Sequence, residues 1–564
     1  MDYKRWLHLP ESKYSAKAIG CWLWHAWRGN RVQAGLNALT GLLGVGASLA
    51  TVWAMQRAID TASGVVEGSV SWAVATMAAI ILFEFALGIA RVWIRNILGV
   101  RAQNRMQQQM LARLLRAEWR GREAMHSGDV INRLEQDVKQ VVTFLTETLP
   151  SVLATLAMFV GAFCYLLQMD TWLAIVTVGI LPVFILASRF YIAQMRQLSK
   201  KVRQSDSLVQ SILTETVQHR MLVKTMEAGG QMLGRLEHTQ HELRQRVKRR
   251  TAFSVASNLV LNTGFSAGYL IAFLWGLLRL QAGTITFGAM TAFLQLVYRI
   301  QGPARDLTRL APAFVSVFTA AERLMELEEV PEEMQGDPVL LPGPCGIRFA
   351  DVTYNYGAPG QLPTVNHANY DFRPGSCTAI LGETGSGKTT LIRLLLALVR
   401  PQEGEVEIYS SHERLPLTPL HRCNFVYVPQ GNTLLSGTLR ENMLLGCPDA
   451  TDAQLLAALH TACADFVDEL PDGLDTVFAE QGGGLSEGQA QRIAIARALL
   501  RKGSILLFDE ATSALDVDTE RQLLVNLLSS GGRTSGSGNE VKRTVIFVTH
   551  RPAVIDFCSN VIRL

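Results

Sequence analysis

The chain has 564 residues, of which 48% are hydrophobic and 18% are charged, and its formal net charge is +4. This length is too great for a single hydrophobic core, so we expect two or more domains. The small net charge gives no indication of a nucleic-acid partner, and none is predicted. Long apolar runs occur before about residue 325, which indicates a membrane domain followed by a soluble one.

The first predicted element is an interfacial segment over residues 1–30. It combines Trp22, Trp24 and Trp27 with Lys17 and Arg28, a composition typical of the boundary between membrane and water. We expect a helix that leads into the bilayer, although an ordinary aromatic belt at a membrane end has the same composition. The polar, charged start predicts no cleavable signal peptide.

Six apolar segments then reach the ~20 residues that a helix needs to cross a bilayer. They are Leu36–Met55, Val70–Ile94, Val141–Leu167, Trp172–Ile192, Phe253–Leu278 and Phe287–Val317. Together they predict a transmembrane domain over residues 31–325, in contact with membrane lipid. The chain is therefore expected to be an integral, multi-pass membrane protein.

The links between these segments indicate their orientation. Thr61–Gly68 and Gln168–Asp170 contain no Lys or Arg, whereas the second-to-third and fourth-to-fifth links are long and basic. The basic residues are Arg101, Arg105, Arg113, Arg116, Arg120 and Arg122 in the first long link, and Lys200, Lys201, Arg203, Lys224, Arg244, Arg246, Lys248, Arg249 and Arg250 in the second. The positive-inside rule places both long links, and both termini, in the cytoplasm.

The first long link also carries apolar residues at helical spacing, at Met106, Met110, Leu111, Leu114 and Leu115. This pattern predicts helices that continue the spans beyond the membrane. Such helices are long enough to contact a cytoplasmic domain. The alternative is that the basic links only fix the topology by binding lipid headgroups.

Glu84 lies inside the second span, within Ile80–Leu87, and Arg91 and Arg95 follow it. An ionisable group is costly in hydrocarbon, so we expect it to face a cavity or a charged partner. We therefore name Glu84 as a candidate substrate-cavity or coupling residue. A structural ion pair and a position nearer the interface are the alternatives.

A linker over residues 326–345 contains Val330–Pro331 and Leu341–Pro344, and turn-forming residues of this kind mark a domain boundary. The remainder, residues 346–564, is predicted to be a nucleotide-binding domain. Its glycine-rich segment Gly382–Thr389 follows an apolar strand, Thr378–Leu381, and precedes a predicted helix, Leu391–Leu398. This is the context that a phosphate-binding loop requires.

The loop matches the pattern G-x-x-x-x-G-K-[ST] in full. Its glycines allow successive backbone N–H groups to surround a triphosphate, while Lys388 reaches the outer phosphates and the Thr389 hydroxyl ligates Mg²⁺. A second motif, Ser504–Glu510, is an apolar strand that ends in two carboxylates. The two motifs together predict a nucleotide hydrolase that uses Mg²⁺.

The eight cysteines are Cys21, Cys164, Cys345, Cys377, Cys423, Cys447, Cys463 and Cys558. None is arranged in a Cys-x-x-Cys pair, so neither a disulfide framework nor a zinc site is predicted. We expect them to behave as small buried hydrophobic residues in a reducing compartment.

Three further motifs complete the pattern: Leu485–Gln489, Ser513–Asp516 and the strand Val545–His550. With them the chain resembles a half-transporter of the ATP-binding cassette (ABC) superfamily, of the exporter type. The resemblance implies an α-helical six-span transmembrane domain followed by an α/β P-loop ATP-binding cassette domain. It extends over nearly the whole chain.

The resemblance also implies roles for individual residues. Tyr356 stacks on adenine, with Tyr354 as the competing choice. The implied ATP-binding set is Tyr356, Gly382, Glu383, Thr384, Gly385, Ser386, Gly387, Lys388, Thr389 and Thr390.

Four residues are implied to act on the γ-phosphate and its Mg²⁺. Gln430 senses both, Asp509 organises the Mg²⁺ that Thr389 and Gln430 also ligate, Glu510 is the general base, and His550 holds the γ-phosphate in the transition state.

The segment Leu485, Ser486, Glu487, Gly488 and Gln489 resembles the signature that faces the ATP of an opposite cassette. The Ser486 hydroxyl, the Gly488 N–H and the following helix N-terminus suit an anion. Glu487 stands where glycine is usual in the family. Because one site then needs two chains, the partner is expected to be a second copy of this chain or a homologous half-transporter.

Two cytoplasmic segments, His126–Leu134 and Glu215–Lys224, resemble those that carry cassette motion into the spans. The implied function is ATP-driven export of a hydrophobic or amphipathic substrate, such as a lipid, drug or peptide, by alternating access. An ATP-gated channel or regulator and a subunit of a heterodimeric exporter are the alternatives, whereas the apolar spans disfavour a soluble cassette ATPase. The architecture suggests a bacterial inner membrane, with the cassette in the cytoplasm.

Overall fold

The computed structural model describes residues 13–119, 127–172, 174–175, 181–357, 363–383, 385–479, 483–529 and 543–564. Arg120, Arg122, His126 and Thr384, which were singled out above, lie outside these residues. The chain divides into two compact units. The first comprises the described residues of Met1–Leu111 and Gly128–Leu327, and the second those of Ala112–Ser127 and Glu328–Leu564.

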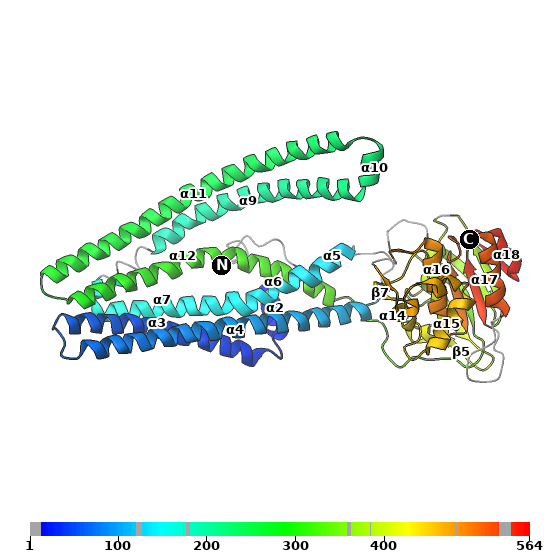
Figure 1. Ribbon diagram of the computed structural model, residues 1–564, viewed down its shortest axis with the longest axis horizontal. Coiled ribbons are helices and arrows are strands. Elements are labelled where there is room, and N and C mark those ends of the chain that lie inside the picture. The colour runs from blue at the N-terminus through cyan, green and yellow to red at the C-terminus, as the bar shows by residue number, and fades with distance from the viewer. Residues whose placement is uncertain are drawn as a thin grey trace. The chain divides into compact units, whose positions relative to one another are not determined.

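The first unit is built from long helices (Figure 1). Its described helices are α2 (Ala16–Ala26), α3 (Arg31–Ala62), α4 (Val70–Arg116), α5 (Ser127–Asn132), η1 (Arg133–Asp137), α6 (Val138–Thr143), η2 (Phe144–Thr148), α7 (Leu149–Met169), α9 (Leu181–Gln218), α10 (Arg220–Thr225), α11 (Gly229–Gln281) and α12 (Phe287–Glu328). The last residues of α4 and the first of α5 belong to the second unit, as does Glu328.

Four helices of the described residues are long and apolar enough to cross a membrane. They are α3, α4, the continuous run Asp129–Met169 and α11, and they contain four of the six predicted spans. The sixth predicted span is helical within α12. The fourth, Trp172–Ile192, includes residues outside the described ones.

The predicted continuation of the second span as a single helix is confirmed by α4. Its 47 residues run without a break from Val70 to Arg116, a length of about 70 Å at 1.5 Å per residue. The hydrocarbon core of a bilayer is only ~30 Å thick. In the same unit, α9 and α11 pack side by side and are joined through the short α10 (Figure 1).

An apolar core holds the first unit together. Val52 of α3, Leu166 of α7 and Phe293 and Leu296 of α12 are fully buried against one another. Beside this core the backbone N–H of Gly288 donates to Asp60 Oδ1 at 3.1 Å. A Cβ atom at residue 288 would lie 2.5 Å from that oxygen, so the close approach of α12 to α3 requires glycine.

Arg133 ties part of the predicted coupling segment to α12. Its Nε donates to Asp129 Oδ2 at 2.9 Å, and its Nη1 donates to Glu326 Oε2 at 2.9 Å and to the Arg323 carbonyl at 2.7 Å. The Arg133 side chain is nearly buried. Because a buried guanidinium is stable only when it is paired, this network fixes the position of η1 against α12.

The second unit has the predicted α/β fold. Its parallel sheet has the strand order β11-β3-β10-β9-β6, and an antiparallel sheet has the order β2-β1-β4-β5. The strands are β1 (Gly346–Tyr354), β2 (Val365–Phe372), β3 (Cys377–Leu381), β4 (Glu403–Tyr409), β5 (Arg414–Pro416), β6 (Phe425–Val428), β7 (Gly437–Thr438), β8 (Val477–Phe478), β9 (Ile505–Asp509), β10 (Thr544–Val548) and β11 (Asn560–Arg563).

The parallel sheet is buried on both faces. Along β9, Leu506 and Phe508 belong to one apolar core, and Ile505 and Leu507 belong to another. This alternation follows from the two-residue period of a strand. A parallel strand that is covered on both sides needs an unbroken apolar run, which is why all four residues of β9 before Asp509 are apolar.

Helices surround these sheets. They are α13 (Lys388–Leu395), η3 (Pro419–Asn424), α14 (Leu439–Leu444), α15 (Asp452–Thr461), η4 (Asp465–Glu469), η5 (Gly473–Asp475), α16 (Glu487–Leu499), α17 (Val517–Ser529) and α18 (Pro552–Phe557). Part of the predicted linker also packs on this unit. The buried Asn424 amide donates to the Val339 carbonyl at 2.7 Å, and its oxygen accepts the Leu341 N–H at 2.9 Å.

Candidate functional site

The predicted catalytic residues come together at one edge of the parallel sheet. Gly382 follows β3, Gln430 lies just beyond β6, Glu510 follows β9 and His550 lies just beyond β10. These strands are parallel neighbours, so their carboxyl ends meet at the same edge. Open α/β sheets bind their ligands at this edge.

The phosphate-binding loop is formed between β3 and α13. Gly387 has a φ of +101°, and a Cβ atom there would lie 2.8 Å from the Thr364 carbonyl oxygen. Lys388 Nζ donates to the Gly382 carbonyl at 2.6 Å and so folds back across the loop. Ser386 Oγ is buried and has no hydrogen-bond partner among the described residues. A cation, an unsatisfied hydroxyl and the N-terminus of α13 therefore surround one place, which fits a phosphate.

The surroundings of Asp509 disfavour its negative charge, which a bound cation would stabilise. Burial and the neighbouring charge of Glu510 raise the pKa of Asp509, while a hydrogen bond from Tyr427 and the charge of Lys388 oppose this rise. The Tyr427 hydroxyl lies 3.4 Å from Asp509 Oδ2. A divalent cation would favour the ionised carboxylate.

The oxygen donors available at this edge fit Mg²⁺. Thr389, Gln430 and Asp509 offer a hydroxyl, an amide oxygen and a carboxylate, the ligand types that Mg²⁺ accepts when phosphate completes its shell. The described residues contain no group of three or more His, Cys, Asp or Glu that could hold a metal. A site that depends on nucleotide phosphate for its remaining ligands needs no such group.

Glu510 is held between Gln430 and His550. Gln430 Nε2 donates to Glu510 Oε2 at 2.9 Å, and His550 Nδ1 lies 3.6 Å from Glu510 Oε1. Glu510 has a φ of +46°, a left-handed conformation that costs energy outside glycine. Its N–H donates to the Val548 carbonyl at 2.9 Å, which maintains that conformation. The arrangement presents a fixed carboxylate at the phosphate edge, as a general base requires.

The signature residues form the N-terminus of α16. Ser486 is the N-cap: its Oγ accepts the Gln489 N–H at 3.2 Å, and the Gln489 side chain accepts the Ser486 N–H at 2.9 Å. Glu487 is the first residue of the helix, where a negative charge interacts favourably with the helix dipole. This gives a physical reason for an acidic residue at that position.

A close contact joins α16 to the segment after β9. A Cβ atom at Gly488 would lie 2.8 Å from the Ala514 carbonyl oxygen. The Gln491 side chain accepts the Ala514 N–H at 3.1 Å and donates to Ser513 Oγ at 3.3 Å. Gly488 is therefore required for packing, in addition to the anion contact that the sequence suggests.

Arg551 was not predicted, yet it organises the same segment. Its guanidinium donates to the carbonyls of Ser513 and Leu515, the latter at 2.9 Å, and it contacts Glu520 Oε2 at 3.3 Å. Glu520 is only 1% exposed. The one feature of the sequence that could have drawn attention to Arg551 is its position directly after His550. That position alone could not identify partners so far away in the sequence.

We predict that Arg551→Met destabilises the second unit. The substitution leaves the Glu520 carboxylate buried without its cation, and breaking a buried pair in this way costs about 3–5 kcal/mol. The unfolding midpoint of the purified protein, measured by differential scanning calorimetry, should fall by several degrees. Arg521→Met, at an exposed position beside Glu520, is the matched control. Equal midpoints for the two variants would contradict the role of Arg551.

Tyr356 is better placed than Tyr354 to contact a base. The Tyr354 side chain is buried in the core, whereas Tyr356 packs edge-on against it with ring centroids 5.1 Å apart. The Tyr356 hydroxyl lies 3.0 Å from Thr390 Oγ1 and accepts a hydrogen bond from Arg393 at 2.9 Å. These bonds attach the ring to α13, the helix that follows the phosphate loop. A pocket of about 370 Å³ lies beside it, and Trp119 also lines this pocket.

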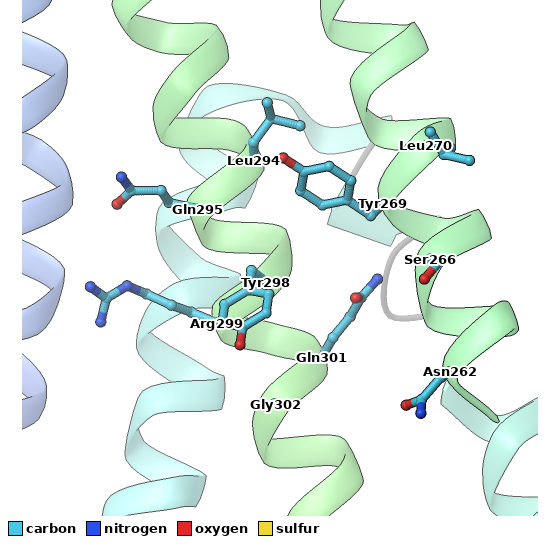
Figure 2. Close-up of a pocket in the computed structure, with 10 residues that line it drawn as sticks. All are labelled: Asn262, Ser266, Tyr269, Leu270, Leu294, Gln295, Tyr298, Arg299, Gln301 and Gly302. Carbon is cyan, nitrogen blue, oxygen red and sulfur yellow. The ribbon is translucent and has the colours of Figure 1, made fainter. Parts of the chain in front are cut away.

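The first unit contains a larger cavity of about 1110 Å³ between α11 and α12. Its lining is Asn262, Ser266, Tyr269 and Leu270 of α11 and Leu294, Gln295, Tyr298, Arg299, Gln301 and Gly302 of α12. Figure 2 shows Tyr269 and Gln301 pointing into the space between the two helices, with Gln295 and Arg299 on the opposite side of α12. Sequence analysis did not identify these residues, because the polar ones among them are, taken one at a time, ordinary residues in an apolar segment.

Glu84 interacts with one residue of this cavity's lining. The Thr51 hydroxyl donates to Glu84 Oε2 at 3.3 Å, and Glu84 interacts electrostatically with Arg299, which also donates to Ser48 Oγ. The described lining of the cavity includes Arg299 and does not include Glu84. The arginines that follow Glu84 have other partners: Arg91 donates to the Gly41 carbonyl, and Arg95 pairs with Glu147.

Comparison with known proteins identifies the family. A family model described as the ABC transporter transmembrane region matches residues 35–303, and one described as ABC transporter matches residues 365–513. Between them they match most of the chain, and their order is the one predicted. The chain therefore belongs to the ABC transporters, in the form that fuses the transmembrane region to one ATP-binding domain. Such a chain hydrolyses ATP to drive transport.

Particular relatives are similar at moderate identity. An ATP-dependent lipid A-core flippase from Chromobacterium violaceum is 28% identical over 503 residues, which cover 87% of this chain and 83% of the relative. Antigen peptide transporter 2 from Mus musculus is 30% identical over 76% of this chain and 62% of its own length. A solved structure of a bacterial Atm1-family ABC exporter with ATP bound has a TM-score of 0.76 at 24% identity, and the match covers 95% of this chain and 93% of that one. This last likeness supports the fold alone.

Proposed function

We propose that this chain uses ATP to export an amphipathic substrate, with both parts of the mechanism encoded in one polypeptide. The observation that carries the proposal is the convergence of the phosphate loop, Asp509, Glu510 and His550 at one sheet edge. The same chain carries helices long and apolar enough to cross a membrane. The first feature supplies nucleotide chemistry and the second supplies a route across the bilayer.

Each site residue takes a specific role in this proposal. The loop amides, the Ser386 hydroxyl and Lys388 bind the phosphates. Glu510 accepts the proton of the attacking water, and His550 holds the γ-phosphate as charge develops. Thr389, Gln430 and Asp509 hold Mg²⁺, which supplies neutralisation of the phosphate oxygens. Hydrolysis then resets a conformation that ATP binding had favoured.

The cavity indicates the chemical class of the substrate. Tyr269 and Tyr298 offer aromatic surface with a polar end, while Gln301 and Asn262 offer amide hydrogen bonds. A ligand with an apolar body and polar groups fits such a lining better than a simple hydrocarbon. The named relatives act on a lipid in one case and on peptides in the other, and drugs of similar character belong to the same class.

A second chain completes each nucleotide site in this proposal. The signature at the N-terminus of α16 faces the ATP of the partner, which is a second copy or a homologous half-transporter. The tip formed by α10 presents exposed apolar residues at Met221 and Leu222, which suits contact with another chain. The membrane is the bacterial inner membrane, with the nucleotide-binding domain in the cytoplasm.

Transport by inverted vesicles tests the proposal. Candidate lipids, drugs and peptides are first screened for stimulation of ATP hydrolysis by the protein in nanodiscs. Inverted vesicles should then accumulate the stimulating compound against its gradient when Mg²⁺ and ATP are added outside. Dissipation of the gradient without accumulation would instead support an ATP-gated channel and would overturn the export proposal.

Tyr269→Ala should weaken recognition of that compound. The change removes an aromatic face from the cavity wall, and we expect the concentration for half-maximal stimulation of ATP hydrolysis to rise about tenfold, corresponding to ~1.4 kcal/mol. Leu259→Ala, an exposed residue of the same helix outside the cavity lining, is the matched control. Equal values for both variants would show that this cavity does not bind the stimulating compound.

A further inference from the structure

Two cysteines of the second unit lie in direct contact, far from each other in the sequence. The Sγ atoms of Cys377 and Cys558 are 3.0 Å apart. Cys377 begins β3, and Cys558 lies between α18 and β11. Both sulfurs are partly buried and pack against the same apolar core.

The contact is set by backbone pairing. The Ser559 N–H donates to the Cys377 carbonyl at 3.0 Å, and the Ser559 hydroxyl donates to the same oxygen at 3.0 Å. From there β11 pairs in parallel with β3, with Asn560 opposite Thr378. The two cysteines are therefore held together by the sheet rather than by chance rotation of their side chains.

The two sulfur atoms are already close to bonding distance. Because Asn560 pairs with Thr378, the position opposite Cys377 is Ser559, and Cys558 directly precedes it. Closing the present separation of 3.0 Å to a bond of about 2.05 Å needs a movement of only ~1 Å. Rotation of the two side chains can supply this without breaking the pairing of β3 and β11.

Three other described cysteines of this unit contact different groups. Cys345 donates to the Gly343 carbonyl, Cys423 donates to the Leu420 carbonyl, and Cys463 accepts from the Asn526 amide. Direct sulfur–sulfur contact thus distinguishes Cys377 and Cys558 among the cysteine contacts that the described residues make.

We propose that Cys377 and Cys558 form a reversible dithiol–disulfide site, whose oxidant is a small-molecule disulfide such as oxidised glutathione. Disulfides of cytoplasmic domains are typically transient and redox-sensing. The site differs from a permanent structural disulfide because Cys377 and Cys558 are both free thiols in this structure. It lies beside the strand that leads into the phosphate loop, and the proposal does not depend on the export function.

The chemistry begins at Cys377. One S–H donates to the other sulfur, and this hydrogen bond lowers the pKa of Cys377 and raises that of Cys558. The Cys377 thiolate attacks one sulfur of oxidised glutathione, forms a mixed disulfide and releases one glutathione thiolate. Cys558 then loses its proton to solvent and attacks the Cys377 sulfur, which releases the second glutathione. Two protein thiols are oxidised, and one glutathione disulfide is reduced to two glutathione molecules.

The bond would strengthen the edge of the sheet next to the phosphate loop. The pairing of β11 with β3 extends to the Leu564 N–H, which donates to the Leu381 carbonyl at 2.8 Å. Leu381 directly precedes Gly382. A covalent link at the other end of this pair prevents the edge strand from separating, so we expect the oxidised protein to unfold at a temperature higher by about 4 °C or more.

Thiol mapping of the full-length protein in nanodiscs tests the proposal. After treatment with oxidised glutathione and removal of excess reagent, a peptide linked through Cys377 and Cys558 should appear in the digest, with a mass lower by two hydrogens than the sum of its parts. Dithiothreitol should remove the link and restore all eight thiols. Absence of the linked peptide from folded, oxidised protein would overturn the proposal.

Variants separate this site from general oxidation. Cys558→Ser should stop at the mixed disulfide of Cys377 with glutathione and lose the increase in unfolding temperature. Cys377→Ser should prevent the link, and Cys558→Ala provides the same test without a new hydroxyl. Cys423→Ser is the matched control and should form the link normally. A link that persists in either Cys558 variant through another cysteine would also contradict the proposed pair.

Discussion

Glu510→Gln is expected to reduce ATP hydrolysis at least ~100-fold while ATP still binds. The amide has nearly the same shape as the carboxylate but cannot accept the proton of the attacking water. Gln430 and His550 contact Glu510 through its two carboxylate oxygens, so the substitution keeps the space filled. The loss should therefore appear in kcat, because the groups that bind the phosphates come from the separate loop between β3 and α13.

Single-turnover and binding measurements on the same preparation separate the two effects. Bound nucleotide is measured by fluorescence of a labelled ATP, and turnover by release of phosphate. Glu413→Gln, at an exposed position on the surface of the same unit, is the matched control and should retain normal turnover. If Glu510→Gln retained more than a tenth of the normal rate, another group would have to serve as the base.

In dimers of two different chains, two substitutions are expected to leave about half of the hydrolysis when they are on separate chains, and to abolish most of it when they are on the same chain. Lys388→Ala removes the cation of the phosphate loop, and Ser486→Arg blocks the signature at the N-terminus of α16. If each nucleotide site combines the loop of one chain with the signature of the other, placing one substitution on each chain damages a single site twice. The second site then remains intact, and roughly half of the normal hydrolysis should persist where the sites act independently.

Placing both substitutions on one chain, beside an unchanged partner, damages both shared sites. Hydrolysis should then fall to the level of a dimer in which both chains carry both substitutions. Dimers of defined composition are obtained by purification through two different affinity tags, one on each chain. Sites contained within single chains would give the reverse pattern, with activity only when one chain is unchanged, and that outcome would contradict a shared site.

Much of the second unit could be predicted because its motifs impose local geometry. The glycines of the phosphate loop, the apolar strand before Asp509 and the strand before His550 each specify a strand and the turn after it. Once parallel pairing is assumed, the ends of these strands must meet. The helical nature of the first unit followed from the length of its apolar segments in the same way, and α4 confirms a span that continues as one helix.

Contacts between distant residues could not be predicted from one sequence. Arg551 binds carbonyl groups and a buried carboxylate more than 30 residues away, and Cys377 meets Cys558 only because β11 returns beside β3. Glu84 shows the same limit: its cost in hydrocarbon indicated a partner, but Thr51 and Arg299 were identified only by the packing of α3, α4 and α12.

The cap of α16 has a further consequence for nucleotide exchange. Ser486 uses one lone pair of its hydroxyl to accept the Gln489 N–H, and a hydroxyl keeps its single hydrogen when it acts as an acceptor. That hydrogen remains available for an arriving phosphate oxygen. A phosphate can therefore bind to and leave the N-terminus of α16 without breaking the cap. The end of the helix stays folded through every cycle of hydrolysis.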